Sequence, residues 1–184
     1  EDTVTVRTSS YVTVRGCDLD YVHAGVFTTH SSHLLLEDNE IHQSFPPGST
    51  WTDLKNSEWE GGGFYASSHG RGMIHIRRNM FRDSFNGVYL TDDSEGRWMN
   101  SNVFISQNTF VNIVDDPFEP EGDSFNLHFF GNALVDTHRM VSLVPASTCL
   151  GPVFVYGNVQ LNDADPTGEA AQGRRKPALR LDPA

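Results

Sequence analysis

A short sequence pattern that ends in asparagine recurs along this chain and constrains its fold more than any other feature. The pattern reads apolar-x-apolar-x-x-Asn, and an early copy has Cys17 in the asparagine slot. The later copies end at Asn39, Asn79, Asn108, Asn132 and Asn158. Successive slots are 22, 40, 29, 24 and 26 residues apart, so a typical repeat has about two dozen residues. This period predicts a solenoid, because each copy can bury its apolar face only against its neighbours.

The alternation of apolar and polar residues within each copy indicates β-strands. A repeat of this length has too few residues for a helix plus strands and fits three short strands with three turns. Asparagine suits a sharp bend because it tolerates left-handed backbone angles and bonds to nearby backbone groups. We therefore expect Asn79, Asn108 and Asn132 to line one buried turn and to bond to one another or to the backbone.

The strand–asparagine–strand signature is similar to that of the right-handed parallel β-helix proteins, over roughly residues 10–161. The resemblance implies an all-β, single-stranded solenoid of about six coils over residues 1–161, with an insertion loop at 43–62. Residues 162–184 are expected to form an irregular tail. The resemblance also implies a secreted protein, extracellular or periplasmic. It does not assign an activity, because lyases, hydrolases, epimerases, esterases and inert adhesins share the fold.

Charge and composition exclude several classes of partner. The net charge is −11 with only 13 basic residues, which argues against a protein that binds nucleic acid. No apolar run approaches the roughly 18 residues of a membrane span. The two cysteines predict neither a disulfide framework nor a zinc site. The end of a solenoid exposes unpaired backbone groups that can pair with another strand. We therefore expect missing sequence or another chain to cover the N-terminal end.

The third strand of each coil can be aligned as well, at residues 26–29, 64–67, 88–91, 118–121 and 141–144. Gly25, Gly63 and Gly87 precede the first three, as a turn would require. In this alignment one column of side chains faces outward along the solenoid. Its members are Phe27, Tyr65, Tyr89, Glu119 and Ser142.

Residues 115–123 hold five acids and no basic residue. Strand alternation directs Glu119 and Glu121 outward with Cα atoms roughly 7 Å apart, and Asp115 and Asp116 lie in the preceding turn. Carboxylates this close raise one another's pKa or bind a cation. Oxygen donors without Cys or His favour Ca²⁺ over zinc. Asp116, Glu119 and Glu121 are therefore candidate Ca²⁺ ligands.

The same acids are candidate catalytic groups. The full candidate catalytic set is Asp115, Asp116, Glu119, Glu121 and His138. His138 is included because the coil spacing places it one coil above Val114, nearest to the acids. Two structural alternatives remain: a solvated acidic turn paired with Arg97 or Arg139, and a hydrogen-bonded surface histidine.

Aromatic residues near the acids point to a polysaccharide or oligosaccharide partner. Tyr65 and Tyr89 would offer flat faces beside hydroxyls and carboxylates, which suits a sugar chain. Trp51 and Trp59 in the insertion could close over the same groove. The alternatives are a tyrosine ladder that only stabilises the sheet and tryptophans that only fasten the insertion to the coil.

Two enzyme families on this fold share short motifs with the acidic segment. Glu119-Pro120-Glu121 resembles the Ca²⁺-holding pair of chondroitinase-B-like and alginate lyases, but residues 124–128 contain no lysine, so His128 would have to act as the base. Asp115-Asp116 resembles the paired acids of polygalacturonase-like hydrolases, but their Gly-His-Gly and Arg-x-Lys segments are missing. Two functions remain: a polysaccharide lyase or glycoside hydrolase, and a non-catalytic structural or sugar-binding segment of a larger extracellular protein.

Overall fold

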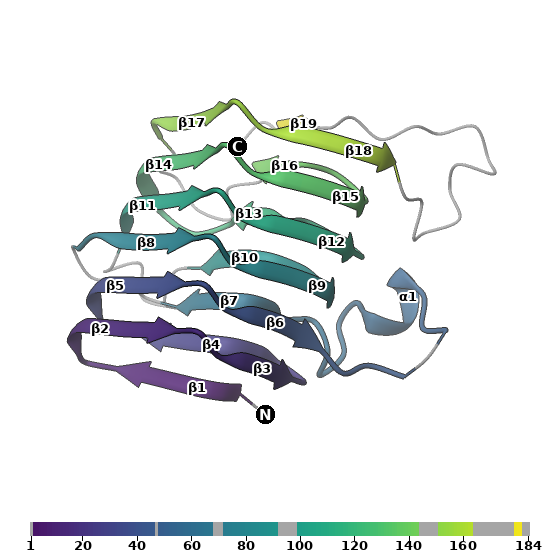
Figure 1. Ribbon diagram of the computed structural model, residues 1–184, viewed down its shortest axis with the longest axis horizontal. Coiled ribbons are helices and arrows are strands. Elements are labelled where there is room, and N and C mark those ends of the chain that lie inside the picture. Colours follow the sequence, from purple (N-terminus) through teal and green to yellow (C-terminus); the bar gives the residue numbers. More distant parts are fainter. Residues whose placement is uncertain are drawn as a thin grey trace.

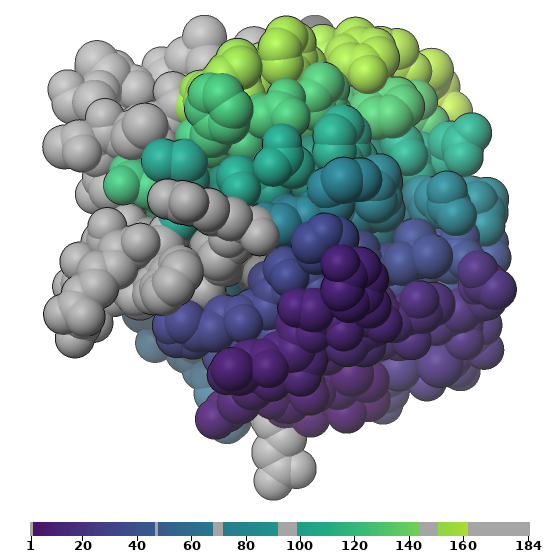
Figure 2. Space-filling view, turned by 90° about the vertical axis from the view of Figure 1, so that its left-hand side faces the viewer, coloured from purple at the N-terminus to yellow at the C-terminus, as the bar shows by residue number. Residues whose placement is uncertain are grey.

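The chain forms a solenoid of parallel strands in the computed structural model (Figure 1). The structure describes residues 2–46, 48–67, 72–91, 99–143, 151–163 and 179–181. Each coil adds one strand to each of three parallel sheets, and the chain makes about five turns, slightly fewer than the six expected. Figure 2 shows the coils as stacked bands that run from purple at the N-terminal coil to yellow-green at the last one. The predicted all-β parallel solenoid is confirmed.

Up to β15, the three sheets take their strands in strict rotation along the chain. The first sheet contains β1 (Asp2–Arg7), β4 (Ala24–Thr29), β7 (Gly62–Ser67), β10 (Asn86–Thr91) and β13 (Phe118–Pro120). The second contains β2 (Ser10–Arg15), β5 (Ser32–Glu37), β8 (Ile74–Arg77), β11 (Asn100–Ser106), β14 (Ser124–Phe130) and β17 (Val153–Tyr156). The third contains β3 (Asp18–Tyr21), β6 (Glu40–Gln43), β9 (Met80–Ser84), β12 (Thr109–Ile113), β15 (Ala133–Thr137) and β18 (Val159–Asp163).

The last coil departs from this rotation. β16 (Val141–Leu143) pairs with β19 (Leu179–Leu181) in a separate two-stranded sheet and does not bond to β13. The predicted place of Ser142 in the outward column therefore has no strand pairing to support it. Most of the predicted tail, residues 164–178 and 182–184, lies outside the described residues, as do residues 92–98 of the loop after β10.

Between the asparagine slots, the interior is filled by the apolar residues of the alternating strands. Phe81 and Phe110, paired in register on neighbouring coils, stack with ring centroids 4.9 Å apart. Within one coil, Phe118 of β13 stacks on Phe129 of β14 at 5.3 Å. Because parallel register places equivalent residues beside one another, like side chains meet like side chains along the axis.

An asparagine ladder runs through the turn between the second and third sheets. The Oδ1 atom of Asn108 accepts bonds from the backbone N and the Nδ2 of Asn79, at 2.9 and 3.0 Å. Asn108 makes the same two donations to Oδ1 of Asn132 and also donates to the carbonyl of Ile76. Asn39 and Asn158 extend the ladder at its two ends. The predicted buried asparagine turn is confirmed.

Three glycines lie inside strands of the first sheet, where a turn was expected. A Cβ atom at Gly63 would lie 2.4 Å from the Phe81 ring, and one at Gly87 would lie 2.6 Å from the Phe110 ring. Gly25 is in the same situation. The prediction of a turn was wrong. Glycine is required at these positions because side chains of the third sheet fill the volume that a Cβ atom would occupy.

The insertion leaves the solenoid after β6 and returns at β7, close to the predicted bounds. It contains one short helix, α1 (Trp51–Leu54), whose N-cap Thr50 and residue Asp53 bond reciprocally. Figure 1 shows α1 beside the ends of the third-sheet strands. Leu54 packs there against Phe85 and Val114, which belong to the turns after β9 and β12.

Replacing Asn108 with Ala tests the ladder. The change leaves the buried Asn79 amide and the Ile76 carbonyl without their hydrogen-bond partners. Each unsatisfied group lowers the stability of the fold by about 1–3 kcal/mol. We expect the free energy of unfolding to fall by about 2–4 kcal/mol in urea titrations. Asn158→Ala, at the half-buried end of the ladder, serves as the comparison and should cost less. Equal costs at the two positions would contradict a ladder stabilised by burial.

Candidate functional site

The candidate site lies in the turn that leads from the third sheet to the first. β12 ends at Ile113 and β13 begins at Phe118, and the two aspartates fall between them. The turn is tied to the preceding coil: the amide of Asp115 donates to the Phe85 carbonyl at 2.8 Å, and the amide of Gly87 donates to the Asp116 carbonyl at 3.0 Å. The backbone of two coils therefore fixes where the acids lie.

Three carboxyl groups converge at this turn. Asp115, Asp116 and Glu119 each offer one oxygen, and these oxygens all lie within 4.8 Å of one another. The three residues are only 5%, 1% and 5% exposed. Glu121 lies outside this group, and its carboxylate accepts a bond from the Tyr89 hydroxyl at 2.6 Å. The structure thus brings together two of the three predicted Ca²⁺ ligands, with Asp115 in place of Glu121.

Asn86 links two of the acids and was missed by the sequence analysis. Its Nδ2 donates to a carboxyl oxygen of Glu119 at 2.8 Å, and its Oδ1 accepts the backbone amide of Asp116 at 3.0 Å. Asn86 is buried at the start of β10, one coil before the acids. Nothing in the sequence around it distinguishes it from a turn asparagine, so only the coil stacking reveals this role.

Two cations approach the two aspartates. Arg139 lies 3.4 Å from Asp116 through Nη1, and both side chains are buried. This confirms the predicted pairing with Arg139, whereas Arg97 lies outside the described residues. Lys55 of the insertion lies 3.8 Å from Asp115 and also pairs with Glu60. Lys55 was missed because it is far from the acids in the sequence.

The carboxyl group of Glu119 has a strongly raised pKa. Its burial, and the negative charges of Asp116, Glu121 and Asp115, raise the pKa of its carboxyl group to about 9, although Lys55 acts in the opposite direction. Burial lowers the pKa of Lys55, but the hydrogen bond to Glu60 and the surrounding carboxylates outweigh it and raise that pKa overall. At neutral pH the cluster therefore combines a protonated Glu119 with a charged Lys55.

His138 contacts Arg139, the cationic partner of Asp116. It is 4% exposed, and its Nε2 lies 3.2 Å from Nη2 of Arg139. Its backbone amide donates to the Ile113 carbonyl, which places it one coil above the acidic turn as predicted. The Nε of Arg139 is buried without a hydrogen-bond partner in the part of the chain that the structure describes.

The aromatic column is confirmed in its predicted register. Tyr89 lies opposite Tyr65 on one side and opposite Glu119 on the other. The Tyr65 and Tyr89 rings are 4.8 Å apart, and the Phe27 ring lies 5.4 Å from Tyr65. All three are half-buried, so a row of aromatic rings leads along the first sheet to the acid cluster.

The two tryptophans of the insertion fasten it to the coil. Trp51 and Trp59 both pack against the cluster of Leu54, Phe85 and Val114. The Nε1 atom of Trp51 is buried and makes no hydrogen bond within the described ranges. This packing accounts for both tryptophans without a sugar, and a sugar contact at either one stays a prediction.

Comparison with known proteins gives one match. A family model described as a right-handed beta helix region matches residues 1–134. Neither the comparison with curated proteins nor the comparison with solved structures gave a match. Within the described residues, no helix has the length and apolar character needed to cross a membrane.

Glu119→Gln tests the charge state of the cluster. The pKa of Glu119 is about 9 in the fold and about 4.3 in an unfolded chain, so unfolding between these pH values releases a proton. This group therefore lowers the stability of the wild type as the pH rises from 5 to 8. Glutamine stays neutral, so we expect the stability of the variant relative to wild type to increase over this range by more than about 1.4 kcal/mol, one pKa unit.

The measurement is the free energy of unfolding in urea at both pH values. Glu58→Gln is the matched control because Glu58 is an exposed glutamate of the insertion. The same pH dependence in Glu119→Gln and wild type would show that Glu119 is ionised in the folded protein.

Proposed function

Because the chain belongs to the right-handed β-helix family, we propose that it is the β-helix segment of a secreted carbohydrate-active protein, and that its acid cluster hydrolyses glycosidic bonds. The row of rings at Phe27, Tyr65 and Tyr89 supports a sugar chain as the substrate, since it leads directly to Glu119. Hydroxyl side chains at Thr29, Ser67 and Thr91 run beside the rings in the same sheet.

The distribution of charge among the three carboxyls carries the proposal. Asp116 lies 3.4 Å from Arg139 and Asp115 lies 3.8 Å from Lys55, so each aspartate has a cationic partner. The hydrogen-bond partner of Glu119 is the neutral amide of Asn86. A protonated carboxyl beside a second carboxyl group in a different environment is the arrangement that glycosidases use.

Each group then has a role in hydrolysis. Glu119 gives its proton to the glycosidic oxygen as the carbon–oxygen bond breaks, and an aspartate attacks the sugar carbon to form a glycosyl-enzyme. Water then gives a proton to Glu119 and hydrolyses this intermediate, which is the route of closely spaced carboxyl pairs. Asp115 suits the second role because its cation, Lys55, belongs to the insertion and can leave with it. Asp116 stays paired with buried Arg139, which His138 contacts and positions.

The substrate gains access when the insertion moves. All three acids are buried, and Lys55 of the insertion contacts Asp115 directly. Trp51 and Trp59 fasten the insertion to the coil, so they control its opening. The two tryptophans therefore affect substrate access through their packing against the coil, without contacting the sugar.

A lyase is less compatible with this geometry. Abstraction of a sugar proton needs a neutral base, but Lys55 is paired with Glu60 and its pKa is raised. His128, the predicted substitute, lies in the second sheet, where it stacks between Phe104 and Phe154. The acids lie in the turn before the first sheet, so His128 does not join them.

Activity of the Glu119→Gln variant tests the proposal. The wild type should release reducing ends from at least one polysaccharide in a panel of neutral and uronate polymers, with no ultraviolet absorbance from an unsaturated product. Glu119→Gln should lose at least about a hundredfold in rate, the size of a general-acid contribution. Glu58→Gln, an exposed glutamate of the insertion, should keep the wild-type rate.

Two results would contradict hydrolysis. An unsaturated product in the wild type would assign a lyase. Equal activity of Glu119→Gln and wild type would remove Glu119 from the reaction, and no activity on any polymer would favour the non-catalytic structural or sugar-binding role.

A Ca²⁺ site is a second candidate, favoured by the convergence of three carboxylate oxygens within 4.8 Å. Asp115, Asp116 and Glu119 would be the ligands, and oxygen donors of this type suit Ca²⁺. A bound ion would supply positive charge toward an acidic sugar. It would have to compete with Lys55 and Arg139, which already approach the two aspartates.

Thermal melts with and without Ca²⁺ test the second candidate. An ion at 100 times its dissociation constant stabilises the native state by about 2.7 kcal/mol, so the melting temperature should rise with millimolar Ca²⁺ and fall with a chelator. The double change Asp115→Asn and Glu119→Gln should abolish the response. Glu121→Gln should retain it because Glu121 lies outside the group, and a melt of the wild type that ignores Ca²⁺ would exclude the site.

A further inference from the structure

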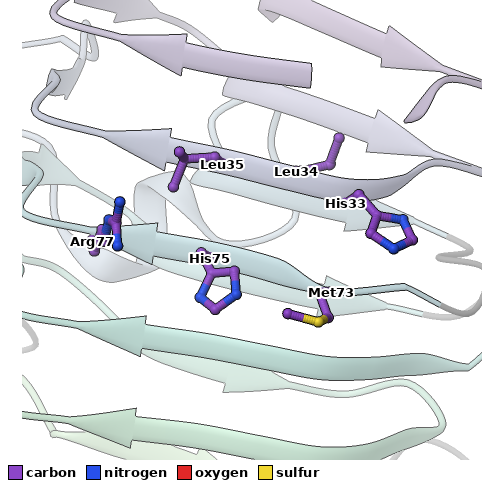
Figure 3. Close-up of a pocket in the computed structure, with 6 residues that line it drawn as sticks. All are labelled: His33, Leu34, Leu35, Met73, His75 and Arg77. Carbon is purple, nitrogen blue, oxygen red and sulfur yellow. The ribbon is translucent and has the colours of Figure 1, made fainter. Parts of the chain in front are cut away.

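A pocket lies on the outer face of the second sheet. It has a volume of about 230 Å³. Its lining comes from strands β5 and β8 and consists of His33, Leu34, Leu35, Met73, His75 and Arg77 (Figure 3). The acid cluster lies elsewhere, in the turn between the third sheet and the first, so the pocket needs an explanation of its own.

We propose that His33, Met73 and His75 bind one Cu(I) ion in this pocket. The three side chains offer two imidazole nitrogens and one thioether sulfur. Thioether and imidazole ligands select soft or borderline metal ions, and Cu(I) is the soft ion among them.

Strand pairing places the three donors together. Leu34 lies opposite Ile74 and Leu35 lies opposite His75, so the same register sets His33 beside Met73. The backbone amide of Leu34 donates a hydrogen bond of 2.9 Å to the Met73 carbonyl, which confirms that the two segments are adjacent here. The strand spacing gives Cα separations of roughly 5 Å for His33–Met73 and roughly 7 Å for Met73–His75. Figure 3 shows Met73 between the two imidazole rings, with its side chain extending toward His75 and the His33 ring on its other side.

The donor atoms are available to a metal. The Nδ1 of His33 bonds to the Ser32 hydroxyl at 3.1 Å, which leaves Nε2 for an ion. His75 makes no hydrogen bond through either ring nitrogen within the described ranges, and Met73 is 45% exposed. Stacking holds both rings in place, with Tyr11 on His33 at 4.6 Å and Phe104 on His75 at 5.0 Å.

The surroundings favour a soft, singly charged ion over a hard divalent one. Leu34 and Leu35 make the floor apolar, and no carboxylate lines the pocket. Arg77, which also lines the pocket, donates to the buried Glu37 at 2.8 Å, and its positive charge beside His75 disfavours a divalent ion more than a singly charged one. Ca²⁺ and Mg²⁺ need several oxygen ligands, which this pocket does not supply.

A sugar is a poorer occupant of this face. His75, Phe104, His128 and Phe154 stack in sequence at 4.6 to 5.0 Å with ring planes 14° to 19° apart. Their faces are therefore turned toward one another, and mainly their edges reach solvent. A sugar ring needs an open aromatic face, so the stack fixes the orientation of His75 without forming a sugar platform.

Anaerobic titration of the full chain with Cu(I) against a colorimetric Cu(I) chelator tests the proposal. Thiols also bind Cu(I), so Cys17→Ser and Cys149→Ser are present in every protein compared. We expect one Cu(I) per chain, and at least tenfold weaker binding in both Met73→Leu and His75→Phe. Met80→Leu is the matched control because Met80 is 42% exposed at the start of β9, and it should bind as the parent does.

Circular dichroism of each variant separates loss of the ligand from loss of the fold. X-ray absorption of the copper-loaded parent should show one sulfur scatterer that is missing in folded Met73→Leu. Unchanged binding in Met73→Leu, or equal loss in Met80→Leu, would overturn the proposal. So would tighter binding of Zn²⁺ than of Cu(I) by the parent.

Discussion

The register between coils is the constraint on which the rest of the structure depends, and the asparagine ladder sets it. Each asparagine bonds to the backbone of one coil and to the asparagine of the next, so a slip of one residue would break several buried bonds at once. With the register fixed, Tyr65, Tyr89 and Glu119 fall in one line. Gly63 and Gly87 then face the rings of Phe81 and Phe110, where no other residue fits.

The fold could be predicted from the sequence because its determinants repeat. The Asn108 slot has equivalents in the other coils, and the alternation around Glu119 matches that around Tyr89, so the strand alignment and the outward column follow. The glycines were misread because a local pattern cannot distinguish a turn glycine from one excluded by a ring of another strand. Only the packed structure shows that Phe110 occupies the space beside Gly87.

The candidate site was only partly predictable because much of it does not repeat. The acidic segment is visible in the sequence, but Lys55 comes from an insertion that belongs to no coil, and Asn86 looks like any turn asparagine. The raised pKa of Glu119 follows from its burial and from the neighbouring Asp116, Glu121 and Asp115, which only the packed coils bring about. The sequence therefore identifies the acids, while the folded chain gives Glu119 a neutral hydrogen-bond partner, Asn86, and Asp116 a cationic one, Arg139.

The insertion also changes how the solenoid comes apart. In a stack where each coil contacts only its neighbours, unfolding can start at either end and spread one coil at a time. Here the insertion leaves after β6 in the second coil, yet its Leu54 packs on Phe85 and Val114, and its Lys55 contacts Asp115 at the entry to the fifth coil. This clamp joins the second to the fifth coil into one cooperative unit and leaves the outer coils to fray independently.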